Sequence, residues 1–192
     1  AEAGLAVKKG GPALGRILDL VKTREAEGYS YDTAQASFEL LARRELGQCP
    51  TFFEVKRYKV SVERRKNKYN RMVSLSEAVV VVRINGEKKM SVSESMDALG
   101  NDRGPVNALS TALAKDLGPY QSMIDDMHLV DYKVRITQGG TEAVTRVVID
   151  SEDSKGRCWS TVGVSANIVD ASFEALLDAI NWKLIRDTGQ GT

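Results

Sequence analysis

Apolar positions follow a helical spacing in the first quarter of the chain. Residues 10–28 carry four apolar side chains at this spacing, and the glycine at their end is a stop signal. Residues 29–46 repeat the pattern, and Ser30 or Asp32 is the N-cap residue that we expect there. This helical pair is too small to bury much apolar surface alone, so we expect it to pack on a neighbour, for which protein upstream of the chain is one candidate.

Strand spacing replaces helical spacing after Pro50. From residue 58 to residue 62 apolar and polar side chains alternate, which predicts a half-buried strand. Two further strands, residues 76–84 and 87–93, are joined by Asn85-Gly86, a dipeptide typical of a tight β-hairpin. The pattern therefore predicts three consecutive antiparallel strands.

A helix is predicted to follow these three strands. Residues 104–118 place four apolar side chains along one stripe, with Gly104 and Pro105 suited to the cap and first turn. Gly118 is expected to end this helix.

The same order of elements then recurs. Alternation from Tyr132 to Ile136 predicts a strand, and Gly139-Gly140 predicts a turn after it. Residues 141–149 and 158–165 predict two more strands. Residues 167–185 predict a closing helix, for which Asn167 and Asp170 form a plausible cap.

The repetition predicts an α+β fold of two tandem, pseudo-symmetric βββα units behind a small helical linker subdomain. Tyr132 follows Tyr58 by 74 residues, whereas Val169 follows Val106 by only 63, so the first copy has the longer loops. The predicted boundaries are 1–49 for the helical linker subdomain, 50–187 for the βββα repeats and 188–192 for a tail. Pairing two such units would cover sheet faces that one unit leaves open.

Composition excludes some classes of function. The 192 residues carry a net charge of +1, which gives no overall field favouring nucleic acid or an anionic membrane. No apolar run approaches the roughly 20 residues that span a bilayer, and the first residues show no signal-peptide pattern. Cys49 and Cys158 have no metal or redox spacing and are interpreted as reduced thiols of a cytoplasmic protein. The start at Ala1 is interpreted as that of a fragment of a longer protein.

The sequence offers few candidate catalytic residues, and none is predicted. The single histidine, His128, has no cysteine or carboxylate partner in a recognisable motif, and no metal site can be assembled from it. Asp125, Asp126 and Asp131 lie near one another, but acidic residues at a strand entrance are usually solvated. A complete small enzyme is therefore disfavoured.

A basic segment and a glycine-containing segment are the remaining candidates. Residues 64–71 hold five basic side chains around Tyr69, which leaves open an RNA-binding βββα module. Near-neutral overall charge counts against that alternative. Residues 98–109 place glycines before a helix start, where backbone N–H groups could hold a small carboxylate and Leu99, Val106 and Leu109 an aliphatic group. A purely structural glycine turn is the alternative reading of that segment.

A family resemblance rests on residues 76–113, 130–136 and 159–176, which include "GNDRGPVNAL", "VDYKVRI" and "NIVDASFEAL". Together they resemble the C-terminal allosteric (dimerisation) domain of the 2-isopropylmalate synthase and citramalate synthase family, over roughly residues 50–186. "GYSYDTAQASFELLARRELG", residues 28–47, resembles the linker subdomain of the (R)-citramalate synthase branch.

The resemblance implies a regulatory role. Family enzymes carry a TIM barrel with a divalent metal that condenses acetyl-CoA with a 2-oxo acid, which is pyruvate in citramalate synthase. The C-terminal domain dimerises and binds the end-product amino acid for feedback inhibition. We therefore expect a homodimer that binds isoleucine, with no cofactor, nucleic acid or membrane partner and no synthase activity of its own. The leucine-binding domain of a 2-isopropylmalate synthase is the alternative.

Matching family motifs onto this sequence implies three groups of effector-binding residues. Asp102 and Arg103 lengthen the glycine loop compared with the family pattern, which affects the donors to the effector carboxylate. The implied residues are Gly100, Asn101, Gly104, Pro105, Val106 and Ala108 in the glycine loop and helix, Leu129, Asp131, Tyr132, Ile136 and Ala143 around the strand, and Asn167, Ile168 and Ala171 at the closing helix.

Overall fold

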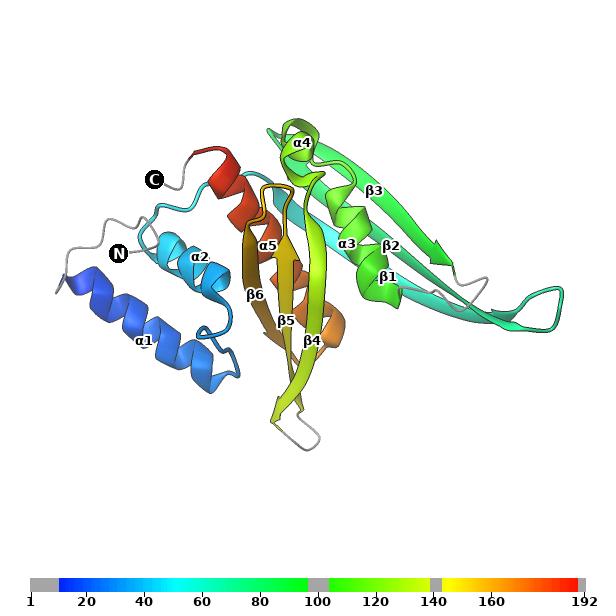
Figure 1. Ribbon diagram of the computed structural model, residues 1–192, viewed down its shortest axis with the longest axis horizontal. Helices are drawn as coiled ribbons and strands as arrows, with labels where there is room; N and C mark the ends of the chain where they lie inside the picture. Colours follow the sequence, from blue (N-terminus) through cyan, green and yellow to red (C-terminus); the bar gives the residue numbers. More distant parts are fainter. Residues whose placement is uncertain (1–10, 97–103, 139–142, 190–192) are drawn as a thin grey trace. The chain divides into compact units, whose positions relative to one another are not determined.

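The computed structural model describes residues 11–96, 104–138 and 143–189 (Figure 1). These residues form an α+β fold, in which N-terminal helices precede two antiparallel three-stranded sheets, each followed by a helix. The predicted fold class is confirmed. The chain divides into unit 1, Ala1–Pro50 with Asp126–Thr192, and unit 2, Thr51–Asp125.

Unit 2 contains the first βββα repeat. Its sheet has the order β1-β2-β3, and Asn85 and Gly86 adopt positive φ angles of 50° and 88° in the predicted hairpin turn. Side chains at alternate positions of the central strand are buried beneath the helix, and Ala78 and Val80 are 0% and 1% exposed. The elements are β1 Glu54–Lys66, β2 Met72–Ile84, β3 Glu87–Met96, α3 Gly104–Ala114, η1 Gly118–Tyr120 and α4 Gln121–Ile124.

Two details of unit 2 differ from the sequence expectations. Strand β1 continues to Lys66, so part of the predicted basic loop extends a long hairpin with β2. Helix α3 ends at Ala114, and Gly118 begins the following 3₁₀ turn instead of ending the helix. Asp116 explains the early end, because its carboxylate accepts a hydrogen bond from the Gly118 amide at 3.1 Å and the chain turns there.

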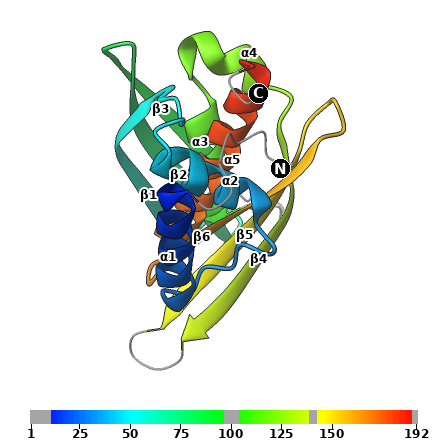
Figure 2. The same ribbon diagram turned by 90° about the vertical axis from the view of Figure 1, so that its left-hand side faces the viewer.

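Unit 1 contains the second repeat and the N-terminal helices. Its sheet has the order β4-β5-β6, and α5 packs on β5 and β6. Helix α2 lies against both β6 and α5, as Figure 2 shows from the side of α1. The elements are α1 Pro12–Ala26, α2 Gln35–Glu45, β4 His128–Gln138, β5 Val144–Glu152, β6 Cys158–Ser165 and α5 Ile168–Asp187.

A close helix–sheet contact fixes α5 against β6. A Cβ atom added at Gly163 would lie 2.0 Å from the carbonyl oxygen of Ala171 and 3.0 Å from the amide nitrogen of Ala175. One turn along, the Thr161 hydroxyl donates a hydrogen bond of 2.9 Å to the Ala175 carbonyl. Glycine is required at residue 163 because the helix backbone occupies the place of a side chain.

The N-terminal helices cover the other side of β6. Tyr29, Tyr31 and Leu41 form a buried cluster with Val162, so the neighbour of the helical pair is the second repeat of the same chain. The predicted N-cap is wrong: α2 is capped at Ala34 without a side-chain hydrogen bond, because Asp32 accepts one from the amide of Thr33 instead. Whether residues 1–49 form a subdomain of the whole protein stays a prediction.

Asn167 is confirmed as the N-cap of α5, since its side chain accepts a hydrogen bond of 2.9 Å from the Val169 amide. Cys49 and Cys158 are free thiols, in agreement with the sequence interpretation. Within the described ranges, no helix is both long and apolar enough to cross a membrane.

Candidate functional site

The start of α3 provides the first group of predicted effector residues. Gly104 has a φ angle of 74°, which favours glycine, and an added Cβ would meet no described atom within 4 Å. Pro105 and Val106 are half-buried in the first turn, whereas Ala108 is 0% exposed and packs in the core of unit 2. Gly100 and Asn101, predicted beside them, lie outside the described residues.

Strand β4 provides the second group. The Tyr132 hydroxyl lies 2.7 Å from the Ser172 hydroxyl of α5, so this ring is on the helix-covered face of the sheet. Two residues before the end of β4, Ile136 is 70% exposed, and Leu129 is 43% exposed near the start of the strand. Exposed apolar side chains at the end of a strand can pack against a hydrocarbon group.

Asp131 carries the negative charge of this second group. Its carboxylate pairs with the Lys133 ammonium at 2.7 Å and accepts a hydrogen bond of 2.8 Å from the Tyr132 amide. The hydrogen bond from Lys133 lowers the pKa of Asp131, which keeps this exposed carboxylate ionised. A ligand ammonium at Asp131 would therefore compete with Lys133.

The start of α5 provides the third group. Asn167 is occupied by capping, Ile168 is 44% exposed and Ala171 is 0% exposed against β6. Ile168 therefore has a side chain available to a ligand, whereas Asn167 and Ala171 hold the helix in place. Ala143, which was predicted with the strand group, is half-buried just before β5.

The predicted effector residues divide between the two units. Those at the start of α3 belong to unit 2, and those on β4, before β5 and at the start of α5 belong to unit 1. Within unit 1 the structure joins β4 to α5 through Tyr132 and Ser172. The effector role of the whole set stays a prediction.

A buried ionic cluster holds the other end of α5. The Lys183 ammonium, with 1% of its side chain exposed, lies 2.9 Å from Asp126, 3.1 Å from Asp153 and 2.7 Å from Asp187. Arg157 adds a contact of 2.6 Å to Asp187. These bonds tie α5 to the β5–β6 turn and to the entrance of β4.

The cluster shifts the pKa values of its members. Burial opposes ionisation of Asp187, but hydrogen bonds from Lys183, Arg157 and Lys155 outweigh it and lower the pKa to about 2. Burial likewise opposes the Lys183 charge, and the surrounding carboxylates still raise its pKa. The members of the cluster are therefore charged around neutral pH, and their ion pairs hold α5 in place.

Polar contacts also join α2 to α5. Asp178 of α5 accepts hydrogen bonds of 2.8 Å from the Ser37 hydroxyl and 2.7 Å from Arg44. Burial raises the pKa of Asp178 although Arg44 opposes the change. Glu39 of α2 accepts hydrogen bonds of 2.9 Å from the Trp182 indole and 2.6 Å from Arg186.

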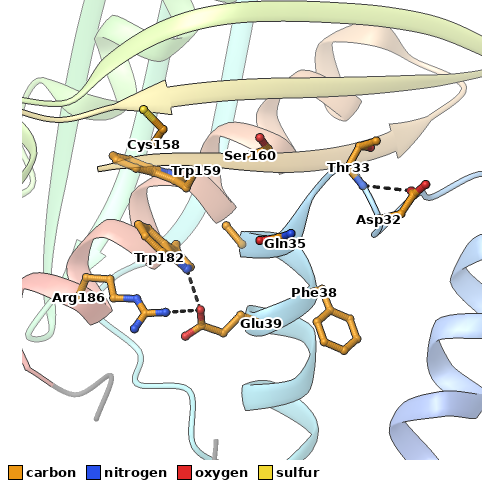
Figure 3. Close-up of a pocket in the computed structure, with 11 residues that line it drawn as sticks. Asp32, Thr33, Gln35, Phe38, Glu39, Cys158, Trp159, Ser160, Trp182 and Arg186 are labelled. Atoms are coloured by element: carbon orange, nitrogen blue, oxygen red, sulfur yellow. Dashed lines mark hydrogen bonds and ion pairs between the residues drawn. The ribbon is translucent and has the colours of Figure 1, made fainter. Parts of the chain in front are cut away.

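A pocket beside these contacts was not predicted from the sequence. It lies among α2, β6 and α5 and has a volume of about 820 Å³ (Figure 3). Trp159 and Trp182 stack in it with ring centroids 5.1 Å apart. Both tryptophans of the chain are found there, and that composition was the signal available in the sequence.

Among the described residues, no group of three or more His, Cys, Asp or Glu side chains could hold a metal ion. His128 begins β4 and pairs in register with Glu152 of β5. The carboxylates of Asp126, Asp153 and Asp187 surround an ammonium group, so the cluster carries its own cation.

These features define an α+β domain with two βββα repeats and a pocket large enough for a small ligand. The model of the LeuA allosteric (dimerisation) domain matches residues 32–184, and the chain belongs to this family. The predicted family resemblance is confirmed.

Curated relatives refine the comparison. The chain is 38% identical over 192 residues to the (R)-citramalate synthase of Aquifex aeolicus, covering 99% of this chain and 34% of that protein. It is 42% identical over 175 residues to the (R)-citramalate synthase of Geobacter sulfurreducens, covering 90% and 31%. A 2-isopropylmalate synthase of Clostridium kluyveri is more distant, at 30% identity over 167 residues, 87% of this chain and 28% of that protein. The chain thus spans about a third of the length of the relatives it matches.

Proposed function

We propose that this chain is the regulatory domain of a citramalate synthase, and that it binds isoleucine as a homodimer for feedback inhibition. One observation carries the choice of branch: the (R)-citramalate synthases of Aquifex aeolicus and Geobacter sulfurreducens match this chain at 38% and 42% identity, whereas the 2-isopropylmalate synthase of Clostridium kluyveri matches it at 30%. Condensation of acetyl-CoA with pyruvate, with its divalent metal, belongs in this proposal to a catalytic domain outside the chain.

The chemistry at the two helix starts supports an amino-acid effector. In unit 2, taken by itself, backbone N–H groups in the first turn of α3 favour a carboxylate, and an added Cβ at Gly104 would meet no described atom within 4 Å. Ile136 and Ile168 expose branched apolar side chains against which an aliphatic group can pack. Asp131 of unit 1 offers a carboxylate to an ammonium group, which would displace Lys133.

An apolar sheet face supports self-association. On the strand positions of unit 2 that alternate with the buried ones, Met90 is 65% and Val92 is 41% exposed, and they pair in register with Val81 and Val79. Exposed apolar surface of this kind marks interaction sites, and a second copy of the chain is the occupant expected in a dimerisation-domain family.

Calorimetric titration with isoleucine, leucine and valine, combined with a light-scattering mass, tests the proposal. We expect a dimer that binds isoleucine most tightly. One misplaced methyl group in an apolar pocket costs about 1–3 kcal/mol, so leucine should bind about tenfold or more weakly. A preference for leucine would instead assign the chain to the isopropylmalate branch, and absence of binding by a folded dimer would leave only the dimerisation role.

A further inference from the structure

The pocket among α2, β6 and α5 has the dimensions of a ligand site. Its volume of about 820 Å³ falls within the range of roughly 300–1,000 Å³ found for small-molecule sites. Figure 3 shows the two indole rings stacked along one wall and the Phe38 ring across from them. Phe38 is 37% exposed although it is a large apolar side chain, so it offers surface for a ligand to cover.

Two buried N–H groups at this pocket have no hydrogen-bond acceptor in the described part of the chain. One is the indole Nε1 of Trp159, a residue that is 5% exposed, and the other is the Nε of Arg186. A buried donor without an acceptor costs about 1–3 kcal/mol, and most buried donors in proteins are paired. Because both nitrogens are almost completely covered, a ligand with acceptor oxygens would pair with them after a small movement of either side chain.

One carboxylate and two guanidinium groups meet at the Glu39 end of the pocket. Arg186 shares Glu39 with Arg43, which contacts the other Glu39 oxygen at 2.8 Å, so two guanidinium groups adjoin one carboxylate. Asp32, the other acidic residue of the lining, lies at the opposite end in Figure 3 and accepts a hydrogen bond from the Thr33 amide.

We propose that this pocket is a second ligand site that binds a small amphipathic carboxylate. Its carboxylate accepts hydrogen bonds from the Trp159 indole and the Arg186 Nε, and its hydrocarbon part packs against Trp182 and Phe38. The proposal is independent of the predicted effector residues, because the pocket is lined by other residues, which belong to unit 1.

Tryptophan fluorescence tests this proposal without background, because both tryptophans of the chain line the pocket. The probe is hexanoate, compared with acetate, which lacks the hydrocarbon part, and hexylamine, which has the opposite charge. We expect a saturable change with hexanoate, with a Kd on the order of 1 mM for so small a ligand. An unchanged signal with hexanoate, or an equal response to hexylamine, would overturn the proposal.

Three variants assign the binding to named groups. Trp159→Phe keeps an aromatic ring but removes the donor, Arg186→Lys keeps the charge but removes Nε, and Phe38→Ala removes the facing ring. Each should weaken hexanoate binding, by about tenfold for the first two, since a hydrogen bond to a charged group contributes about 1.5–3 kcal/mol. The matched control Arg57→Lys changes an exposed arginine on β1 of unit 2 and should bind hexanoate as the wild type does. Unchanged affinity in every folded pocket variant contradicts the assignment.

Thiol chemistry gives a readout that does not depend on fluorescence. Cys158 is exposed and lines the pocket, whereas burial raises the pKa of the Cys49 thiol, which lies outside that lining. Hexanoate should slow alkylation of Cys158 by iodoacetamide several-fold and leave Cys49 unaffected. Equal rates at Cys158 with and without hexanoate would show that the pocket is not occupied.

Discussion

The two βββα units of this chain share one order of elements but differ in how their helices are held. In unit 2, α3 spans 11 residues, and Lys89 and Asp116 form an ion pair with side chains 30% and 49% exposed. In unit 1, α5 spans 20 residues and is fastened by the buried Lys183 cluster. The repeat thus sets the order of elements, and the ion pairs that hold the helix of the second repeat are far more buried than the pair in unit 2.

The helix–sheet contact differs at equivalent positions. Val147 and Gly163 are paired in unit 1, where Ala78 and Ser93 are paired in unit 2. Glycine lets α5 approach β6 until backbone meets backbone, whereas Ser93 occupies the matching place with a buried hydroxymethyl group. Unit 1 should therefore depend much more strongly on a single residue of its edge strand.

Removing the central cation of the cluster should cause the largest difference between the units. Lys183→Met leaves three carboxylates around an uncharged side chain, and losing one partner of a buried ion pair costs about 3–5 kcal/mol. Urea unfolding followed by far-ultraviolet circular dichroism, which reports the helices and strands of both units, measures the loss. The control Lys89→Met breaks the solvent-exposed pair of unit 2 and should lower stability far less. Equal losses would show that the cluster does not fasten α5.

Adding one methyl group at the β6–α5 contact should be nearly as damaging. Gly163→Ala forces the Ala171 carbonyl to move, and we expect a loss of about 3 kcal/mol in the free energy of unfolding. Gly15→Ala is the matched control: it lies in α1, and an added Cβ would meet no described atom within 4 Å. This control should be neutral or stabilise the protein by up to about 1 kcal/mol. A stable Gly163→Ala protein would contradict the close contact.

Acid should weaken unit 1 in a defined range. An unfolded aspartate has a pKa of about 3.9, and that of Asp187 is lowered to about 2 in the folded chain. Ionised Asp187 contributes about 2–3 kcal/mol to the free energy of unfolding. This contribution is fully present above about pH 4 and is lost as the pH falls through 2. Unfolding curves between pH 2 and 6 measure it. The free energy of unfolding of the Lys183→Met protein should depend less on pH. An identical pH dependence would show that Lys183 does not lower the pKa of Asp187.

Much of this architecture could be predicted from the sequence because it depends on local patterns. Period-two alternation, the Asn85-Gly86 turn and the Asn167 cap each specify their own segment, and the structure confirms them. The early end of α3 was missed because it depends on a side-chain interaction, in which the Asp116 carboxylate accepts a hydrogen bond from the Gly118 amide where the chain turns.

Long-range packing could not be predicted in the same way. The packing of α2 on α5 depends on hydrogen bonds from Ser37 and Arg44 to Asp178. Ser37 lies 141 residues and Arg44 lies 134 residues before Asp178 in the sequence. The tryptophan pocket likewise needs β6, α5 and α2 together, and no motif signals that arrangement. The effector residues came from family resemblance, and their local roles differ: Asn167 and Ala171 hold α5, whereas Ile136 and Ile168 are exposed.

The most direct measurement is calorimetric titration of isoleucine into two variants at equivalent repeat positions. Ile136 and Val62 are 70% and 54% exposed, so Ile136→Ala and Val62→Ala should both fold normally. If the aliphatic group of the effector packs on the second repeat, Ile136→Ala should weaken isoleucine binding by about tenfold, which corresponds to about 1.4 kcal/mol of lost apolar contact. Val62→Ala, at the equivalent position of the first repeat, should leave binding unchanged. Unaltered binding by Ile136→Ala, or a loss confined to Val62→Ala, would contradict the account.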